Sequence, residues 1–374
     1  MKKRSLQWIS LLVTIILIVS SLAACGGNAE ETAKKKEGAG TEEAASQDTD
    51  SQEASSENDK EKPENSGDAL PGEGKTVAIL MHSVADEFIY AVYQAAAARA
   101  ESYGFDIYYV DAKNDAATQT AAIEDAISKG VDAIMLCPVD AQALSDSVGM
   151  INEAGIPVTL ADRTVEEGDY VAVCASDNVS CGYDGGVELA EAAKAQGIDV
   201  KDLKVVELQG DLASTSGLER SQGFQKAAEE LGFEIVSSLP TYWESDTAYN
   251  AALDALQANS DINAIYLASD GVMADAVVSA LEQVGKLKPV GEDGHIIITT
   301  VDGTPGVIDY IKEGYIDAVC AQPAITMAND AIDYLVKALD GEVELNGKIN
   351  DALSPVIGTK DNIDSDELWA NTLE

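Results

Sequence analysis

The chain has 374 residues, a formal net charge of −42 at neutral pH, two histidines and five cysteines. This charge argues against nucleic-acid binding, because the phosphate backbone would be repelled. No cysteines form a C-x-x-C pair and few histidines are available as partners, so the sequence predicts no metal site.

Residues 1–24 have the features of a secretory signal peptide. A basic start is followed by an apolar run over 9–19, which is too short and wrongly flanked for a typical membrane span. The ending Leu22-Ala23-Ala24-Cys25 resembles a bacterial lipobox, which implies that Cys25 is the lipidated first residue of the mature protein. A palmitate-type acyl anchor there would hold the protein outside the cytoplasm, on the cell membrane of a bacterium. An ordinary cleaved signal with a chance cysteine is the alternative.

Residues 25–74 combine the candidate lipidated cysteine with an acidic linker rich in Glu, Asp, Ser, Ala and Gly. Large apolar side chains are nearly absent, so the segment cannot bury enough surface to offset its ordering entropy. We therefore expect a disordered tether between the membrane and a folded part of roughly 300 residues.

From residue 75 onward, apolar runs alternate with longer amphipathic segments that often end at glycine. This alternation, with a period near 30 residues, is typical of βαβ units and a parallel sheet. The expected strands are 76–82, 106–111, 131–137, 156–161, 170–175, 204–209, 233–237, 264–268, 295–301 and 316–321. The expected helices are 86–103, 116–129, 140–154, 178–195, 217–231, 246–258, 272–284, 305–313 and 324–339. The fold class is therefore α/β, with two consecutive doubly wound, Rossmann-like sheets.

Polar side chains recur where the expected strands end. The strand at 156–161 runs into Asp162 and Arg163, whose carboxylate and guanidinium suit a ligand with many hydroxyl groups. For this pair alone, a structural ion pair is the alternative. Because ligands bind at the carboxyl ends of strands in open α/β sheets, the recurrence predicts one binding site at this edge. The other groups at or just after strand ends are Asp86, Phe88, Cys137, Arg220, Trp243, Ser269, Asp302 and Gln322.

Residues 77–349 resemble the type I periplasmic sugar-binding proteins, the ribose and galactose receptors of ABC transporters. The resemblance is carried by the stretches 157–163 (PVTLADR), 175–178 (ASDN), 207–210 (ELQG), 219–224 (ERSQGF) and 302–305 (DGTP). It implies a monomeric, non-enzymatic protein without a cofactor that captures a monosaccharide and delivers it to an ABC permease.

The resemblance also implies ligand contacts. Phe88 and Trp243 would sandwich the sugar ring. Polar contacts would come from Asp86, Asp162, Arg163, Arg220, Asp302 and Gln322. Two asparagines of the family are replaced here by Cys137 and Ser269, which are expected at the site in their place. Features of hexose and ribose receptors are mixed, so both an aldopentose and an aldohexose stay open.

The organisation that the resemblance implies has two lobes joined by three crossings, near 176–177, 322–323 and 351–355. The N-terminal lobe would comprise 75–176 plus 323–351, and the C-terminal lobe and tail 177–322 plus 352–374. Ligand contacts from both lobes are completed only in the closed state, so the ligand favours closure.

Functions other than sugar capture fit the sequence less well. An enzyme is disfavoured, since no G-x-G-x-x-G follows the first strand and no Ser-His-Asp arrangement is evident. A sugar or autoinducer sensor that presents its closed form to a membrane signalling protein is the alternative. The acidic segment 361–367 lacks the glycine and distant glutamate of a calcium loop, which favours a solvated tail. Cys174 and Cys181 could form a disulfide or stay buried thiols.

Overall fold

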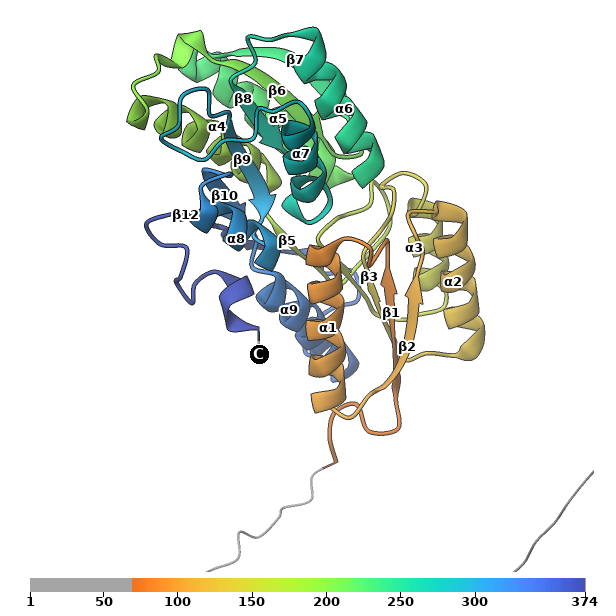
Figure 1. The fold of residues 1–374 in the computed structure, drawn as a ribbon. Coiled ribbons are helices and arrows are strands. Elements are labelled where there is room, and N and C mark those ends of the chain that lie inside the picture. Colours follow the sequence, from red (N-terminus) through yellow and green to blue (C-terminus); the bar gives the residue numbers. More distant parts are fainter. Residues whose placement is uncertain (1–68, 374) are drawn as a thin grey trace, which may run out of the picture. The chain divides into compact units, whose positions relative to one another are not determined.

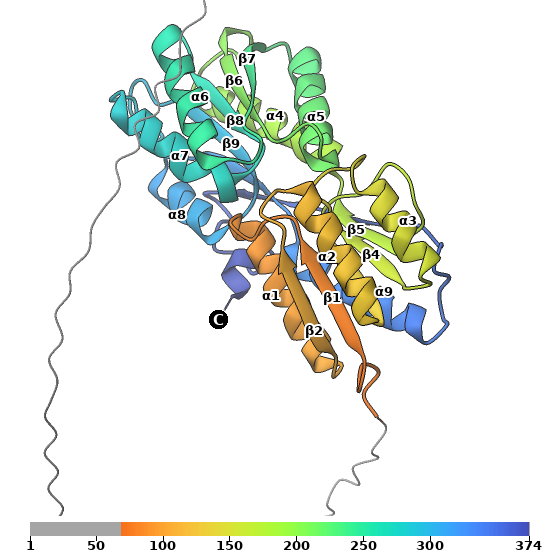
Figure 2. The same ribbon diagram turned by 90° about the vertical axis from the view of Figure 1, so that its right-hand side faces the viewer.

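The computed structural model describes residues 69–373, and within them two six-stranded sheets carry helices on their faces (Figure 1, Figure 2). The predicted signal peptide, Cys25 and most of the predicted linker lie outside the described residues. The predicted α/β class with two doubly wound sheets is confirmed.

The first sheet has the strand order β11-β5-β4-β3-β1-β2 and is parallel throughout. Its strands are β1 (Thr76–Met81), β2 (Asp106–Asp111), β3 (Ala133–Leu136), β4 (Val158–Ala161), β5 (Ala172–Ser176) and β11 (Ile349–Leu353). Its helices are α1 (Glu87–Ser102), α2 (Ala116–Lys129), α3 (Ser145–Glu153) and α9 (Ala324–Leu339). Because helices cover both faces, β1, β3 and β4 are nearly continuous apolar runs with buried side chains.

The second sheet has the order β12-β10-β9-β8-β6-β7, in which only β12 is antiparallel to its neighbour. Its strands are β6 (Lys204–Gln209), β7 (Glu234–Pro240), β8 (Ala264–Leu267), β9 (Ile297–Asp302), β10 (Ala318–Ala321) and β12 (Val356–Thr359). Its helices are α4 (Asn178–Ala195), α5 (Thr215–Leu231), α6 (Ser245–Ala258), α7 (Asp270–Gln283) and α8 (Pro305–Glu313). Two short 3-10 turns, η1 (Val200–Asp202) and η2 (Trp369–Thr372), complete the described part.

Each sheet forms the core of one lobe. Within residues 69–373 the chain passes between the sheets between β5 and α4, between β10 and α9, and between β11 and β12. On the first sheet, α1 and α9 pack together on one face and α2 and α3 on the other. The carboxyl ends of the parallel strands in both sheets carry the loops of the candidate site.

Helix starts follow the sequence closely, because capping side chains fix them. The side chains of Asp86, Asp115, Asp177 and Ser214 accept backbone N–H bonds at the starts of α1, α2, α4 and α5. The helix expected from residue 140 begins only at Ser145. Instead, the carboxylate of Asp140 accepts the N–H groups of Gln142 and Ala143, which makes a turn.

The C-terminal part differs from expectation in two respects. The strands β11 and β12 were not predicted, because each is short and only half-buried and gives a weak apolar pattern. In the segment predicted as a solvated tail, 361–367, all four acidic residues are exposed, but Ile363 is buried, and so are Leu368 and Trp369 directly after the segment. This part of the prediction is wrong, since alternating acidic residues concealed the apolar anchors between them.

Candidate ligand-binding site

The two lobes touch directly beside the strand ends. The Thr164 N–H of the first lobe donates to Thr215 Oγ1 of the second at 3.2 Å, and the Ala141 N–H donates to the Ala213 carbonyl at 3.2 Å. These contacts bring the loops after β3 and β4 against the start of α5 and the loop that precedes it. The carboxyl ends of the strands of the two sheets therefore face each other at this contact.

Asp302 at the end of β9 organises the second lobe's side of the site. Its carboxylate accepts hydrogen bonds from Arg220 Nη1 at 3.2 Å, Gln322 Nε2 at 2.7 Å and Ser269 Oγ at 2.5 Å. All four side chains are buried. The structure thus joins four of the predicted site residues in a single hydrogen-bond network, and burial raises the pKa of Asp302.

Arg220 on α5 is held in place from several directions. Its Nε donates to Asn178 Oδ1 at 2.9 Å, and its Nη1 also donates to the Ala268 carbonyl at 2.7 Å. Burial disfavours its charge, but the carboxylates of Asp302 and Asp162 raise its pKa overall. Asn178 was part of a motif in the sequence, but its role in aligning this guanidinium depends on packing between α4 and α5.

That packing is unusually close. A Cβ at Gly182 would lie 1.9 Å from the carbonyl oxygen of Arg220, and a Cβ at Gly223 would lie 2.0 Å from that of Val179. The two helices therefore meet at backbone contact, and only glycine fits at both positions. The contact sets how far Arg220 reaches toward the first lobe.

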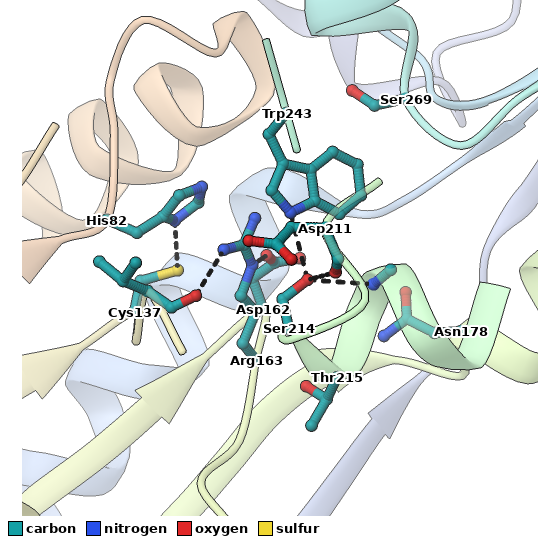
Figure 3. Close-up of polar contacts among 12 residues, drawn as sticks. His82, Cys137, Asp162, Arg163, Asn178, Asp211, Ser214, Thr215, Trp243 and Ser269 are labelled. Carbon is teal, nitrogen blue, oxygen red and sulfur yellow. Dashed lines mark hydrogen bonds and ion pairs between the residues drawn. The ribbon is translucent and has the colours of Figure 1, made fainter. Parts of the chain in front are cut away.

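Asp162 and Arg163 supply the first lobe's side of the site (Figure 3). Arg163 Nε lies 3.2 Å from Asp162 Oδ2, and Asp162 adopts a left-handed conformation with φ of 63°. The other oxygen, Asp162 Oδ1, is buried and has no hydrogen-bond partner among the described residues. Arg220 Nη2 lies 3.9 Å from it. A buried carboxylate oxygen without a donor costs free energy, so this oxygen is suited to a ligand hydroxyl.

Trp243 connects the two halves. Its Nε1 donates to Ser214 Oγ at 3.1 Å, and the Arg163 guanidinium of the opposite lobe lies 5.3 Å from its ring centroid (Figure 3). Its φ of 58° is left-handed. A Cβ at Gly210 would lie 2.0 Å from the indole Cη2, so glycine is needed for the ring to lie there.

Asp86 lies where the first lobe meets α7. Its carboxylate caps α1 by accepting the Phe88 N–H at 2.9 Å. Burial, together with the nearby carboxylates of Asp302 and Asp162, raises the pKa of Asp86 to about 7.

Phe88, predicted to stack on a sugar, has a relative exposure of 1% and packs edge-to-face on Trp369, with 6.1 Å between the ring centroids. The structure places its ring in the core of the first lobe.

Cys137 at the end of β3 has a partner that the sequence reasoning did not assign. His82 Nδ1 lies 3.2 Å from Cys137 Sγ (Figure 3). Burial, together with the charge of Arg163, lowers the pKa of His82, and burial raises that of Cys137, so both are neutral. The sequence offered one signal for this role of His82: the residue directly follows the strand β1, as the other predicted site residues follow theirs. Cys174 and Cys181 are buried free thiols, which answers the question of a disulfide between them.

Two cavities adjoin these residues. One of about 280 Å³ is lined in part by His82, Asp86 and Trp243. Another of about 460 Å³ is lined in part by Asp162 and Asn178. The other predicted site residues line neither cavity. They are Phe88, Cys137, Arg163, Arg220, Ser269, Asp302 and Gln322.

Two α/β lobes with donors and acceptors converging from both define a two-lobed solute-binding protein. Comparison with known proteins agrees: the chain belongs to the periplasmic binding protein domain family, which matches residues 77–343. This is a family of solute binders, and the predicted resemblance to its type I sugar-binding members is confirmed.

Individual relatives support the assignment. The chain is 28% identical to a ribose import binding protein of Salmonella typhimurium over 71% of this chain and 86% of that protein. It is 30% identical to one of Bacillus subtilis over 70% of this chain and 79% of that protein. A solute-binding protein of Bacillus halodurans with bound myo-inositol aligns with a TM-score of 0.69 and 27% identity, covering 81% and 99% of the two chains. Within residues 69–373, no helix is long and apolar enough to cross a membrane.

Proposed function

We propose that the protein captures a monosaccharide, an aldopentose or aldohexose, between its lobes and delivers it to an ABC permease by hinge closure. The observation that carries the proposal is the buried, unpartnered Asp162 Oδ1 beside two guanidinium groups from opposite lobes. An acceptor and several donors at one point suit the hydroxyl groups of a sugar. The relatives named for ribose import, and the neighbour with bound myo-inositol, agree with a polyhydroxylated ligand.

The proposal includes the wider organisation of the chain. The lobes would follow the predicted bounds, 75–176 plus 323–351 and 177–322 plus 352–374, except that residues 352 and 353 would belong to the first lobe, because β11 pairs with β5 up to Leu353. Cys25 would carry the lipid anchor, and the acidic linker would hold a monomeric binding domain outside the cell membrane. Ligand contacts that form only when the lobes meet would stabilise the closed state, which the permease would recognise.

A thermal-shift screen of the purified protein against D-ribose, L-arabinose, D-allose, D-galactose and myo-inositol tests the ligand class. Ligand at about 100 times its Kd adds about 2.7 kcal/mol of stability, which raises Tm by roughly 3–5 °C for a folded part of this size. A shift only with an amino acid or a nucleoside would overturn the proposal.

Asp162→Asn then tests the site itself. The substitution keeps the shape of the side chain but removes the charge from the unpartnered oxygen. Because hydrogen bonds to charged groups contribute about 1.5–3 kcal/mol, Kd for the bound sugar should rise by roughly 10- to 100-fold. Asp254→Asn, at an exposed position on α6, is the matched control and should bind like the wild type. Equal affinity of both variants would contradict the assignment of Asp162.

A further inference from the structure

The segment after β12 connects the cores of the two lobes without being part of either sheet. Ile363 and Leu368 are buried in the apolar core of the second lobe. Trp369, the next residue, is buried in the core of the first lobe, against α1 and α9. Figure 1 shows this end of the chain beside α8 and α9. Two adjacent side chains are thus anchored in different cores.

Trp369 lies directly behind the ligand site. Its Nε1 donates to the backbone carbonyl of Asp302 at 2.9 Å. Its ring meets Phe88 edge-to-face, with 6.1 Å between centroids and 74° between planes. The Phe88 N–H in turn binds the carboxylate of Asp86. The Trp369 indole therefore contacts Asp302 of the second lobe directly. In the first lobe it contacts Phe88, whose N–H holds the carboxylate of Asp86.

The backbone of Asp302 needs such support. Its φ of 114° is strongly disfavoured for a residue with a side chain, and such conformations persist only where the surroundings over-determine them. Its carbonyl accepts from both the Gln322 N–H at 3.1 Å and the Trp369 indole. The following N–H groups, of Gly303 and Thr304, donate to Asp270 at 2.8 and 3.0 Å. Without the indole donor, one of these restraints on the Asp302 peptide is lost.

We propose that Trp369 is a positioning residue of the ligand site. It lines neither of the two cavities at the site, but it fixes the Asp302 peptide so that the carboxylate stays directed at Arg220, Ser269 and Gln322. Its ring also ties this loop to the start of α1, where Asp86 enters the site. The inference rests on the proposed function, since it assigns Trp369 a part in binding the same ligand.

Trp369→Phe tests the proposal, because it keeps an aromatic ring against Phe88 and removes only the N–H donor and part of the ring. Titration with D-ribose and with myo-inositol, well below the melting temperature, should show a Kd raised by about 3- to 10-fold, the effect expected for one lost buried hydrogen bond. Leu368→Ala is the matched control, since it opens a cavity in the second core one residue away. It should lower Tm at least as much as Trp369→Phe while Kd stays at the wild-type value.

The outcomes are distinguishable. A selective rise of Kd in Trp369→Phe supports the positioning role. If Trp369→Phe binds as tightly as the wild type, or if Leu368→Ala weakens binding equally, the segment only stabilises the fold and the inference is overturned. If the wild type binds neither compound nor any other sugar of the panel, the proposed function fails and the inference fails with it.

Discussion

A glycine in the first turn of α7, Gly271, lies at the contact between the two lobes. A Cβ at Gly271 would lie 2.6 Å from Asp86 Oδ1 and 3.3 Å from the Phe88 nitrogen, on the opposite lobe. The first distance is far inside van der Waals contact, and the oxygen cannot move away freely because it caps α1. Gly271→Ala should therefore oppose the closed state while leaving each lobe intact.

The expected loss of affinity in Gly271→Ala can be worked out from the capping bond between the Asp86 carboxylate and the Phe88 N–H. In Gly271→Ala, the lobes can approach as before only if the Asp86 carboxylate moves away, which loses a capping interaction of about 1–2 kcal/mol. If the cap is kept, the lobes must stay farther apart. The loss of the cap corresponds to a Kd raised by roughly 5- to 30-fold. When the lobes separate, the methyl group keeps only an ordinary contact with Thr304 of the same lobe, at 3.4 Å, and alanine is the better helix former by up to about 1 kcal/mol. The Tm of the ligand-free protein should therefore fall little or not at all.

Isothermal titration with the sugar identified in the screen, together with ligand-free melting curves, checks this expectation. Gly306→Ala is the matched control: it lies in the first turn of α8 and lines the same cavity, but its nearest neighbour is 3.9 Å away. Wild-type affinity for Gly271→Ala would refute the closure geometry. Equal weakening by Gly306→Ala would show that the effect is not specific to the contact with Asp86.

Two further predictions concern stability. Because the pKa of Asp86 is raised to about 7, the folded chain holds this proton more tightly than the unfolded chain. The free energy of unfolding should therefore fall by roughly a few kcal/mol through this group as pH rises from about 4 to 7. Asp86→Asn, which can still cap α1, should remove that part of the slope in urea unfolding at pH 5 and pH 7.5. An unchanged slope would mean that Asp86 is not the group responsible. Gly182→Ala would place a methyl group 1.9 Å from the Arg220 carbonyl, so it should cost about 1–3 kcal/mol and lower Tm by several degrees. Gly149→Ala on α3, which meets nothing within 4 Å, should leave Tm unchanged or raise it; similar Tm values for the two variants would contradict the close helix contact.

The fold was largely predictable because its signals are local. Buried parallel strands are apolar throughout, and capping residues and glycines mark the helix ends, so the order of elements can be read from the sequence. The site was predictable in outline for a related reason. Parallel strands of one sheet place their carboxyl ends at one edge, so Asp302 and Gln322, at the ends of the neighbouring strands β9 and β10, had to lie near one another. The approach of Asp162, which follows β4 of the other sheet, depends in addition on how the two lobes face each other.

What the sequence could not show depends on contacts between distant segments. Phe88 follows a strand end as a stacking residue would, but its direction is set by Trp369, which lies 281 positions later in the chain. The pairing of His82 with Cys137 likewise requires β1 and β3 to be neighbours. Nothing local distinguishes a buried anchor such as Ile363 from a chance apolar residue in an acidic tail.

The balance of charge in the site bears on the kind of ligand it can take. Three buried carboxylates, from Asp86, Asp162 and Asp302, meet two guanidinium groups, from Arg163 and Arg220. Burial is the main cause of the raised pKa values of Asp86 and Asp302, and repulsion by the neighbouring carboxylates adds to it. A carboxylate or phosphate ligand beside these buried groups would add to this repulsion. A neutral polyol instead donates hydroxyl hydrogens to the acidic oxygens and accepts from the arginines, so it satisfies both kinds of group without bringing a further charge.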